Sequence, residues 1–167
     1  YLHLKQKECV ALGLAEYYQC AHCITHHLKA AHRLDNIEEK TITKNINSII
    51  LLLSIYTRNI TAEEKEHCLM ACNTFASKMS ISSGEIATPN LNGLAIGIAR
   101  DDDFLIELCG KQVIKILRSQ KIETRPAIGE LESIVIFMKA AASKNRVADK
   151  LESLFDSTND QQQIINQ

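Results

Sequence analysis

The chain has 167 residues, of which 46% are hydrophobic and 23% charged, a length and composition that suit one globular domain with a substantial core. Its net charge of −1 gives no electrostatic basis for binding nucleic acid or an anionic membrane. No apolar run is long enough to span a bilayer. We therefore expect neither nucleic acid nor membrane among its partners. The chain has six cysteines but is too long and too apolar to need disulfides for stability, so we expect a cytoplasmic protein.

The hydrophobic pattern predicts helices through most of the first half. The first two cover about residues 2–18 and 20–34, and they are joined by a turn near residues 18 and 19. A third is expected over about 37–57. The sequence Thr-Ala-Glu-Glu at 61–64 is a capping box, which opens a fourth helix that ends near residue 80.

The next segment is predicted to contain two loops around one helix. The first loop covers 82–93, where Thr88 and Pro89 can start a short helical piece. The acidic run Asp101–Asp103 marks the start of a helix that ends near residue 120, because the helix dipole favours negative charge there. The second loop covers 121–126.

The last predicted helices cover 128–144 and 146–156. The residues after them, 157–167, form a polar tail that we expect to be disordered. No segment shows sustained alternation of apolar and polar residues, so no strand is predicted. The pattern thus favours an all-α fold of six to eight helices in a single domain, residues 1–156.

The stretch from residue 20 to residue 27, CAHCITHH, holds two cysteines and three histidines. If the first two helices are antiparallel, Glu8 and His27 both lie roughly 13–15 Å from the turn and can face each other. A lone carboxylate on an apolar stripe is costly to bury, and His27 can share a hydrogen bond with it. Cys23 lies one turn before His27, with Cys20 three residues further back, at the helix start, where the dipole lowers a thiol pKa. This order of carboxylate, imidazole and thiols can draw a proton from a cysteine.

The spacing Glu8, eleven residues, Cys20-x-x-Cys23-x-x-x-His27 resembles the signature of the alkylhydroperoxidase D-like branch of the carboxymuconolactone decarboxylase family. The resemblance covers about residues 3–34, a fifth of the chain. It implies a helix bundle of the alkylhydroperoxidase D-like type, with the CxxC on an antiparallel helix pair, that assembles as a trimer or hexamer. It also implies a peroxidase or disulfide reductase of antioxidant defence.

The resemblance further assigns roles to the site residues. Cys23 would attack a hydroperoxide and become a sulfenic acid, and Cys20 would protonate the leaving oxygen and then close an intramolecular disulfide. Glu8 and His27 would relay the proton, with His22 assisting. An external thiol, a lipoyl-type group or a peroxiredoxin partner would reduce the pair again. No cofactor and no bound metal is expected.

Two other readings of the CxxC pair stay open. The pair can be a structural or regulatory disulfide in a non-catalytic helical assembly module. Alternatively, Cys20, Cys23 and His27 can bind zinc, with a carboxylate or His26 as fourth ligand. A second cluster, His67, Cys68 and Cys72, has helical spacing and is expected to be core packing, as is Cys109.

Overall fold

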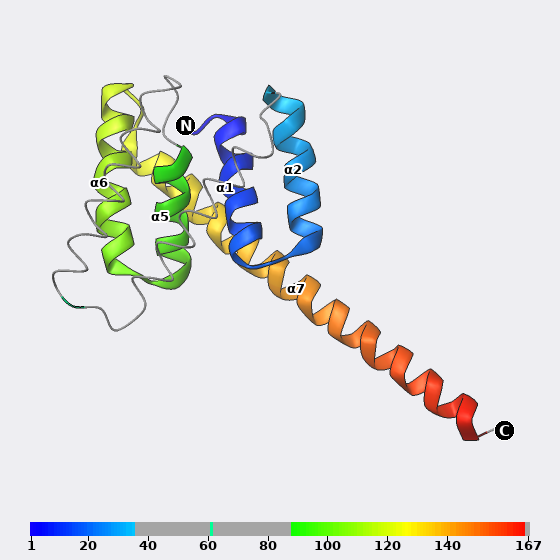
Figure 1. The fold of residues 1–167 in the computed structure, drawn as a ribbon. Helices are drawn as coiled ribbons and strands as arrows, with labels where there is room; N and C mark the ends of the chain where they lie inside the picture. The colour runs from blue at the N-terminus through cyan, green and yellow to red at the C-terminus, as the bar shows by residue number, and fades with distance from the viewer. Residues whose placement is uncertain (36–60, 62–87, 166–167) are drawn as a thin grey trace.

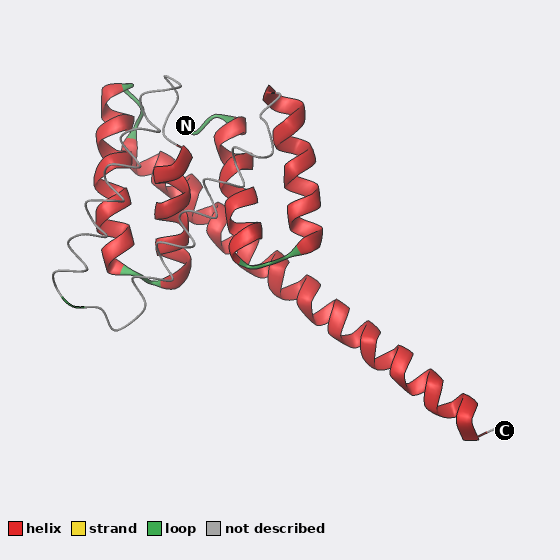
Figure 2. Cartoon of the chain, in the orientation of Figure 1, coloured by secondary structure: helices red, strands yellow, loops and turns green. Residues whose placement is uncertain are grey.

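The computed structural model describes residues 1–35, 61 and 88–165, and for residues 32, 35, 88, 89 and 156–165 it describes only the backbone. Within these residues the chain forms five helices and no strand (Figure 2), so the predicted all-α class is confirmed. The predicted helices over 37–57 and from 61 to 80 lie outside the described residues, apart from Thr61. None of the described helices is long and apolar enough to cross a membrane.

The first two helices are α1, Leu4–Tyr17, and α2, Ala21–Asp35, which form the antiparallel pair predicted from the sequence (Figure 1). Their connection is tight because Gln19 takes a left-handed φ of 55°. The backbone amide of Cys20 then donates to the carbonyl of Ala15 at 3.0 Å. This turn places Cys20 immediately before α2.

A second antiparallel pair is made by α5, Thr88–Arg100, and α6, Asp103–Ser119. The acidic run does start α6, since Oδ1 of Asp102 accepts a hydrogen bond from the Leu105 amide at 3.2 Å. The sequence allowed a short helical piece to start at Thr88 and Pro89, and α5 does begin there, but it continues to Arg100, so the loop predicted over the rest of 88–93 is wrong. Pro89 fits the first turn of α5, where its missing N–H leaves no helical hydrogen bond unmade.

The last helix, α7, runs from Thr124 to Ile165 without a break. The two helices predicted at 128–144 and 146–156 are therefore one, and α7 continues through most of the segment predicted as a polar tail. It contacts all four other helices, crosses behind both pairs and extends beyond them (Figure 1).

The core lies between the two helix pairs and the first part of α7. Its largest fully buried apolar side chains come from α1, α5, α6 and α7. They are Val10, Leu12, Leu14, Leu91, Ile96, Val113, Leu117, Leu131 and Met138. Helix α1 contacts α2, α5 and α7 and is buried all round from Cys9 to Ala15. Leu4, at the start of the helix, is instead 60% exposed.

Candidate functional site

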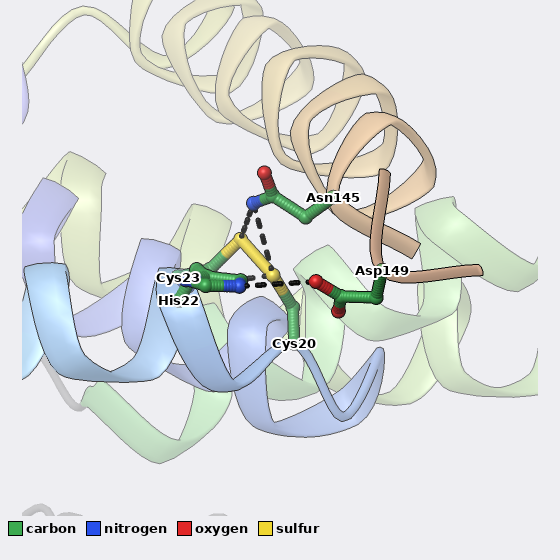
Figure 3. Close-up of a disulfide and its surroundings, with 5 residues drawn as sticks. All are labelled: Cys20, His22, Cys23, Asn145 and Asp149. Carbon is green, nitrogen blue, oxygen red and sulfur yellow. Dashed lines mark hydrogen bonds and ion pairs between the residues drawn. A yellow bond between two sulfur atoms is a disulfide. The ribbon is translucent and has the colours of Figure 1, made fainter. Parts of the chain in front are cut away.

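Cys20 and Cys23 form a disulfide at the start of α2 (Figure 3), with their Cα atoms 5.3 Å apart. The carbonyl of Cys20 accepts the first hydrogen bond of α2, from Ile24 at 2.9 Å, so Cys20 occupies the N-cap position. Both cysteines are buried, at 7% and 6% exposure. The pair is thus held in the first turn of a helix, at the end where backbone N–H groups and the helix dipole favour negative charge on sulfur.

Hydrogen-bond donors reach the two sulfurs from two directions. The backbone N–H of Cys23 points to Sγ of Cys20 at 3.3 Å. The side-chain amide of Asn145, on α7, donates to Sγ of Cys20 at 3.4 Å and to Sγ of Cys23 at 3.5 Å (Figure 3). Asn145 was missed by the sequence analysis, which placed a helix break at this position.

The predicted contact between Glu8 and His27 is confirmed. Nδ1 of His27 on α2 lies 2.8 Å from Oε2 of Glu8 on α1, and the two side chains are 14% and 22% exposed. Because an ionised carboxylate can only accept, a hydrogen bond to it requires the hydrogen on Nδ1, which leaves Nε2 as the acceptor whenever the ring is neutral. Cys23 is four residues before His27 and lies on the same side of α2. The arrangement therefore places an oriented base one helical turn from a cysteine.

Unlike the side chain of His27, which contacts α1, the side chain of His22 contacts α7. Its Nε2 lies 3.2 Å from Oδ1 of Asp149 on α7, and both side chains are largely exposed. An exposed pair of this kind adds little to stability. Its effect is to join the start of α2 to α7 beside the disulfide. Asp149, like Asn145, was not singled out from the sequence.

A cleft of about 530 Å³ opens between the turn before α2 and the middle of α7. One wall is formed by the turn and the start of α2, with Tyr18, Gln19, Cys20, Ala21 and His22. The other wall is formed by α7, with Lys139, Ala142, Ser143, Asn145, Arg146 and Asp149. Cys20 is thus part of the cleft wall, whereas Cys23 is not. Burial, and next the neighbouring Tyr17, raise the pKa of Tyr18 above its ordinary value of 10.0.

The structure offers no alternative metal centre in the part of the chain that it describes, where no three His, Cys, Asp or Glu side chains are grouped to hold an ion. The sulfurs of Cys20 and Cys23, joined to each other, are not thiolate ligands in this state. The second cluster considered from the sequence, His67, Cys68 and Cys72, lies outside the described residues. Cys109 packs partly buried against the core, as expected.

Comparison of the chain with protein-family models, with curated proteins and with solved structures found no match.

Proposed function

We propose that the chain is a thiol-dependent peroxidase or disulfide oxidoreductase of antioxidant defence, in which Cys20 and Cys23 cycle between two thiols and a disulfide. The observation that carries the proposal is the position of this disulfide, at the start of α2, on the helix that also holds His27 against Glu8 at 2.8 Å. An oriented base one helical turn from the pair suits redox chemistry, in which a thiol must lose its proton, and it has no task in a purely structural disulfide.

The Glu8–His27 pair has a defined task in this chemistry. Glu8 fixes the imidazole with its proton on Nδ1, so Nε2 can take the proton of the Cys23 thiol. The Cys23 thiolate then attacks the hydroperoxide, which forms an S–O bond and breaks the O–O bond. The departing alkoxide takes a proton from Cys20 and leaves as an alcohol.

The second half-reaction closes the disulfide. The thiolate of Cys20 attacks the sulfur of the Cys23 sulfenic acid, and hydroxide leaves with the proton held by His27. In sum, two thiols and one hydroperoxide give one disulfide, one alcohol and one water. Asn145 supports both thiolates because its amide N–H groups reach both sulfurs.

The resemblance of Glu8, Cys20, Cys23 and His27 to the alkylhydroperoxidase D-like signature supports the same assignment of roles. Membership of that family, its bundle type and its trimeric or hexameric assembly are part of the proposal. The assisting role of His22 also stays a prediction, and its contact with Asp149 suits a residue at the rim of the cleft.

A single-turnover experiment tests the proposal. The protein is reduced, mixed with one equivalent of an organic hydroperoxide, quenched with an alkylating agent and weighed, alongside its Cys20→Ser and Cys23→Ser variants. We expect rapid loss of two alkylatable thiols in the unmodified chain, a trapped sulfenic acid in Cys20→Ser, and none in Cys23→Ser. Thiols that stay alkylatable for many minutes would rule out a peroxidase.

Burial of both sulfurs also suits a second candidate, a structural or regulatory disulfide in a helical assembly module. In that case oxidation would change stability or assembly without turnover of peroxide. Thermal unfolding and sedimentation of the reduced and oxidised chain, next to the turnover assay, separate the two functions.

A further inference from the structure

We propose that the cleft beside Cys20 is the docking site of the thiol that reduces the pair, and that this thiol is a small anionic molecule. The inference rests on the proposed function, since it concerns how the oxidised pair returns to the thiol state. It names the entry route, the sulfur that is attacked and the charge of the reductant.

The direction from which the reductant approaches the disulfide depends on which sulfur lines the cleft. Cys20 lines the cleft and Cys23 does not, so a thiol bound there meets the disulfide from the side of Cys20. Asn145 also lines the cleft and donates to both sulfurs, so its N–H groups remain with whichever sulfur carries charge. A thiol bound in the cleft can thus reach the Cys20 end of the disulfide.

The exchange step balances without a further reactant. The thiolate of the reductant attacks Sγ of Cys20, a new S–S bond forms to Cys20, and the Cys20–Cys23 bond breaks. The electron pair goes to Sγ of Cys23, where the Asn145 amide stabilises the thiolate until it is protonated. A second thiolate of the same class attacks the reductant's sulfur in the mixed disulfide. This leaves both cysteines reduced and the reductant as its own disulfide.

The charge of the reductant follows from the α7 wall. Lys139 and Arg146 both line the cleft, are exposed, and have no ion-pair partner within the described residues. The lining holds one carboxylate, Asp149, whose Oδ1 lies 3.2 Å from Nε2 of His22. With Lys139 and Arg146 the lining carries a net positive charge, which attracts an anion and raises its local concentration. The volume of about 530 Å³ suits a small molecule.

The test measures reduction of the oxidised full chain, with no peroxide present. Three thiols are compared at equal thiolate concentration: 2-mercaptoethanesulfonate, which is anionic, 2-mercaptoethanol, which is neutral, and cysteamine, which is cationic. The reaction is quenched with an alkylating agent, and the peptides that carry Cys20 and Cys23 are weighed. We expect the anionic thiol to react roughly tenfold faster than the neutral one at low salt, the cationic thiol to be slowest, and added salt to reduce the difference.

Charge-reversed variants assign the effect to the cleft. Lys139→Glu combined with Arg146→Glu should remove or reverse the preference for the anionic thiol. Lys144→Glu makes the same kind of change at an exposed position of α7 outside the cleft lining, and it should keep the preference. Early in the reaction the mixed disulfide should be found on Cys20, with Cys23 alkylated.

Two results would overturn the inference: equal rates for the three thiols at low salt, or a mixed disulfide found on Cys23. Neither depends on peroxide. A chain that passes this test and yet fails to consume hydroperoxide would retain the reductant site and lose only the peroxidase function. Conversely, a chain that consumes hydroperoxide but shows no charge preference would keep the peroxidase function and lose only the reductant site.

Discussion

The side chain of Asn145 is the donor that both sulfurs share, and its effect depends on their oxidation state. A hydrogen bond to a thiolate is stronger than one to a neutral disulfide sulfur, so Asn145 favours the reduced pair. We expect Asn145→Ala to lower the reduction potential by roughly 30–60 mV, the equivalent of about 1.5–3 kcal/mol for a two-electron couple.

Equilibration in redox buffers, followed by alkylation and mass measurement, gives this potential. Lys144→Ala is the matched control, because it alters the neighbouring exposed residue, which does not reach the sulfurs. A potential that stays the same in Asn145→Ala would show that the amide does not act on the pair.

In the proposed relay, Glu8 determines which nitrogen of His27 acts as the base, and replacement of Glu8 tests this relay. Glu8→Gln keeps the size of the side chain and removes the charge that fixes the Nδ1 proton. We expect attack of Cys23 on hydroperoxide to slow on the order of 10²-fold at neutral pH. Single-turnover rates measure this.

Because Glu8 acts only through the ring, Glu8→Gln should add little to the defect of His27→Ala. Additive defects in the double variant would contradict a relay. Lys29→Ala is the control at an exposed position of the same helix, and its rate should equal that of the unmodified chain.

At this scale the sequence was sufficient for contacts within the first helix pair and insufficient for those made by α7. The Glu8–His27 contact follows from helix rise on either side of one short turn, so spacing alone predicted it. Asn145 is separated from Cys20 by 125 positions, and such a contact depends on how α7 packs. A polar, poor helix former in mid-helix was taken for a break, although its side chain bonds to sulfur.

Among the helices, α1 and α5 approach closely at a glycine. A Cβ atom on Gly13 would lie 2.6 Å from Oδ1 of Asn92, a buried side chain of α5. We expect Gly13→Ala to lower the free energy of unfolding by about 1–3 kcal/mol, because the helices must separate or Asn92 must move. Urea unfolding measures this.

Gly129 on α7 provides the matched control, since a Cβ atom there would meet nothing within 4 Å. Gly129→Ala should raise the free energy of unfolding by about 0.5–1 kcal/mol, because alanine restricts the unfolded chain. Two variants with the same sign would refute the close packing of α1 on α5.

The same close approach explains why the first half of α5, residues 88–93, was assigned to a loop with no more than a short helical piece in it. Its sequence, TPNLNGLAIGIAR, begins with residues typical of turns, and those residues serve packing instead. Asn90 and Asn92 are buried, and a Cβ on Gly93 would lie only 2.5 Å from Sγ of Cys109 on α6. The helix propensity of single residues contains no information about packing against a neighbouring helix.

For the whole molecule, Glu130 joins the beginning of the described chain to α7. Its carboxylate accepts from the Leu2 amide at 2.8 Å and pairs with the Tyr1 amino group at 3.0 Å and Lys7 at 3.1 Å. Burial acts to raise its pKa, but together the Leu2, Tyr1 and Lys7 contacts outweigh it and hold the pKa at about 2.

The lowered pKa predicts a dependence of stability on pH. A carboxylate whose pKa is lower in the folded state stabilises it above the ordinary value of 4.5, and this contribution is lost as pH falls from there towards about 2. Glu130→Gln should therefore be less stable than the unmodified chain at neutral pH, with the difference vanishing near pH 2. Unfolding curves across this range, with the exposed Glu132→Gln as control, measure it; a difference that persists at the acid end would contradict the assignment.

The length of α7 was the main feature of the whole molecule that periodicity did not predict. A helix of 42 residues keeps no single apolar stripe, because its first part packs on the core while its later side chains from Arg146 to Phe155 are exposed. The hydrophobic pattern therefore changes along α7, and this change was interpreted as the end of a helix. The homo-oligomer implied by the resemblance stays a prediction, which sedimentation of the full chain would test.

The division of the site between α2 and α7 has a consequence for engineering. The sulfurs and their base belong to the first 27 positions, while Lys139 and Arg146 belong to one face of a different helix. In the proposed mechanism, electron transfer and the choice of reductant thus depend on separate parts of the sequence. Substituting a few surface positions of α7 should convert the protein to accept cationic or neutral thiols while its oxidant chemistry stays intact.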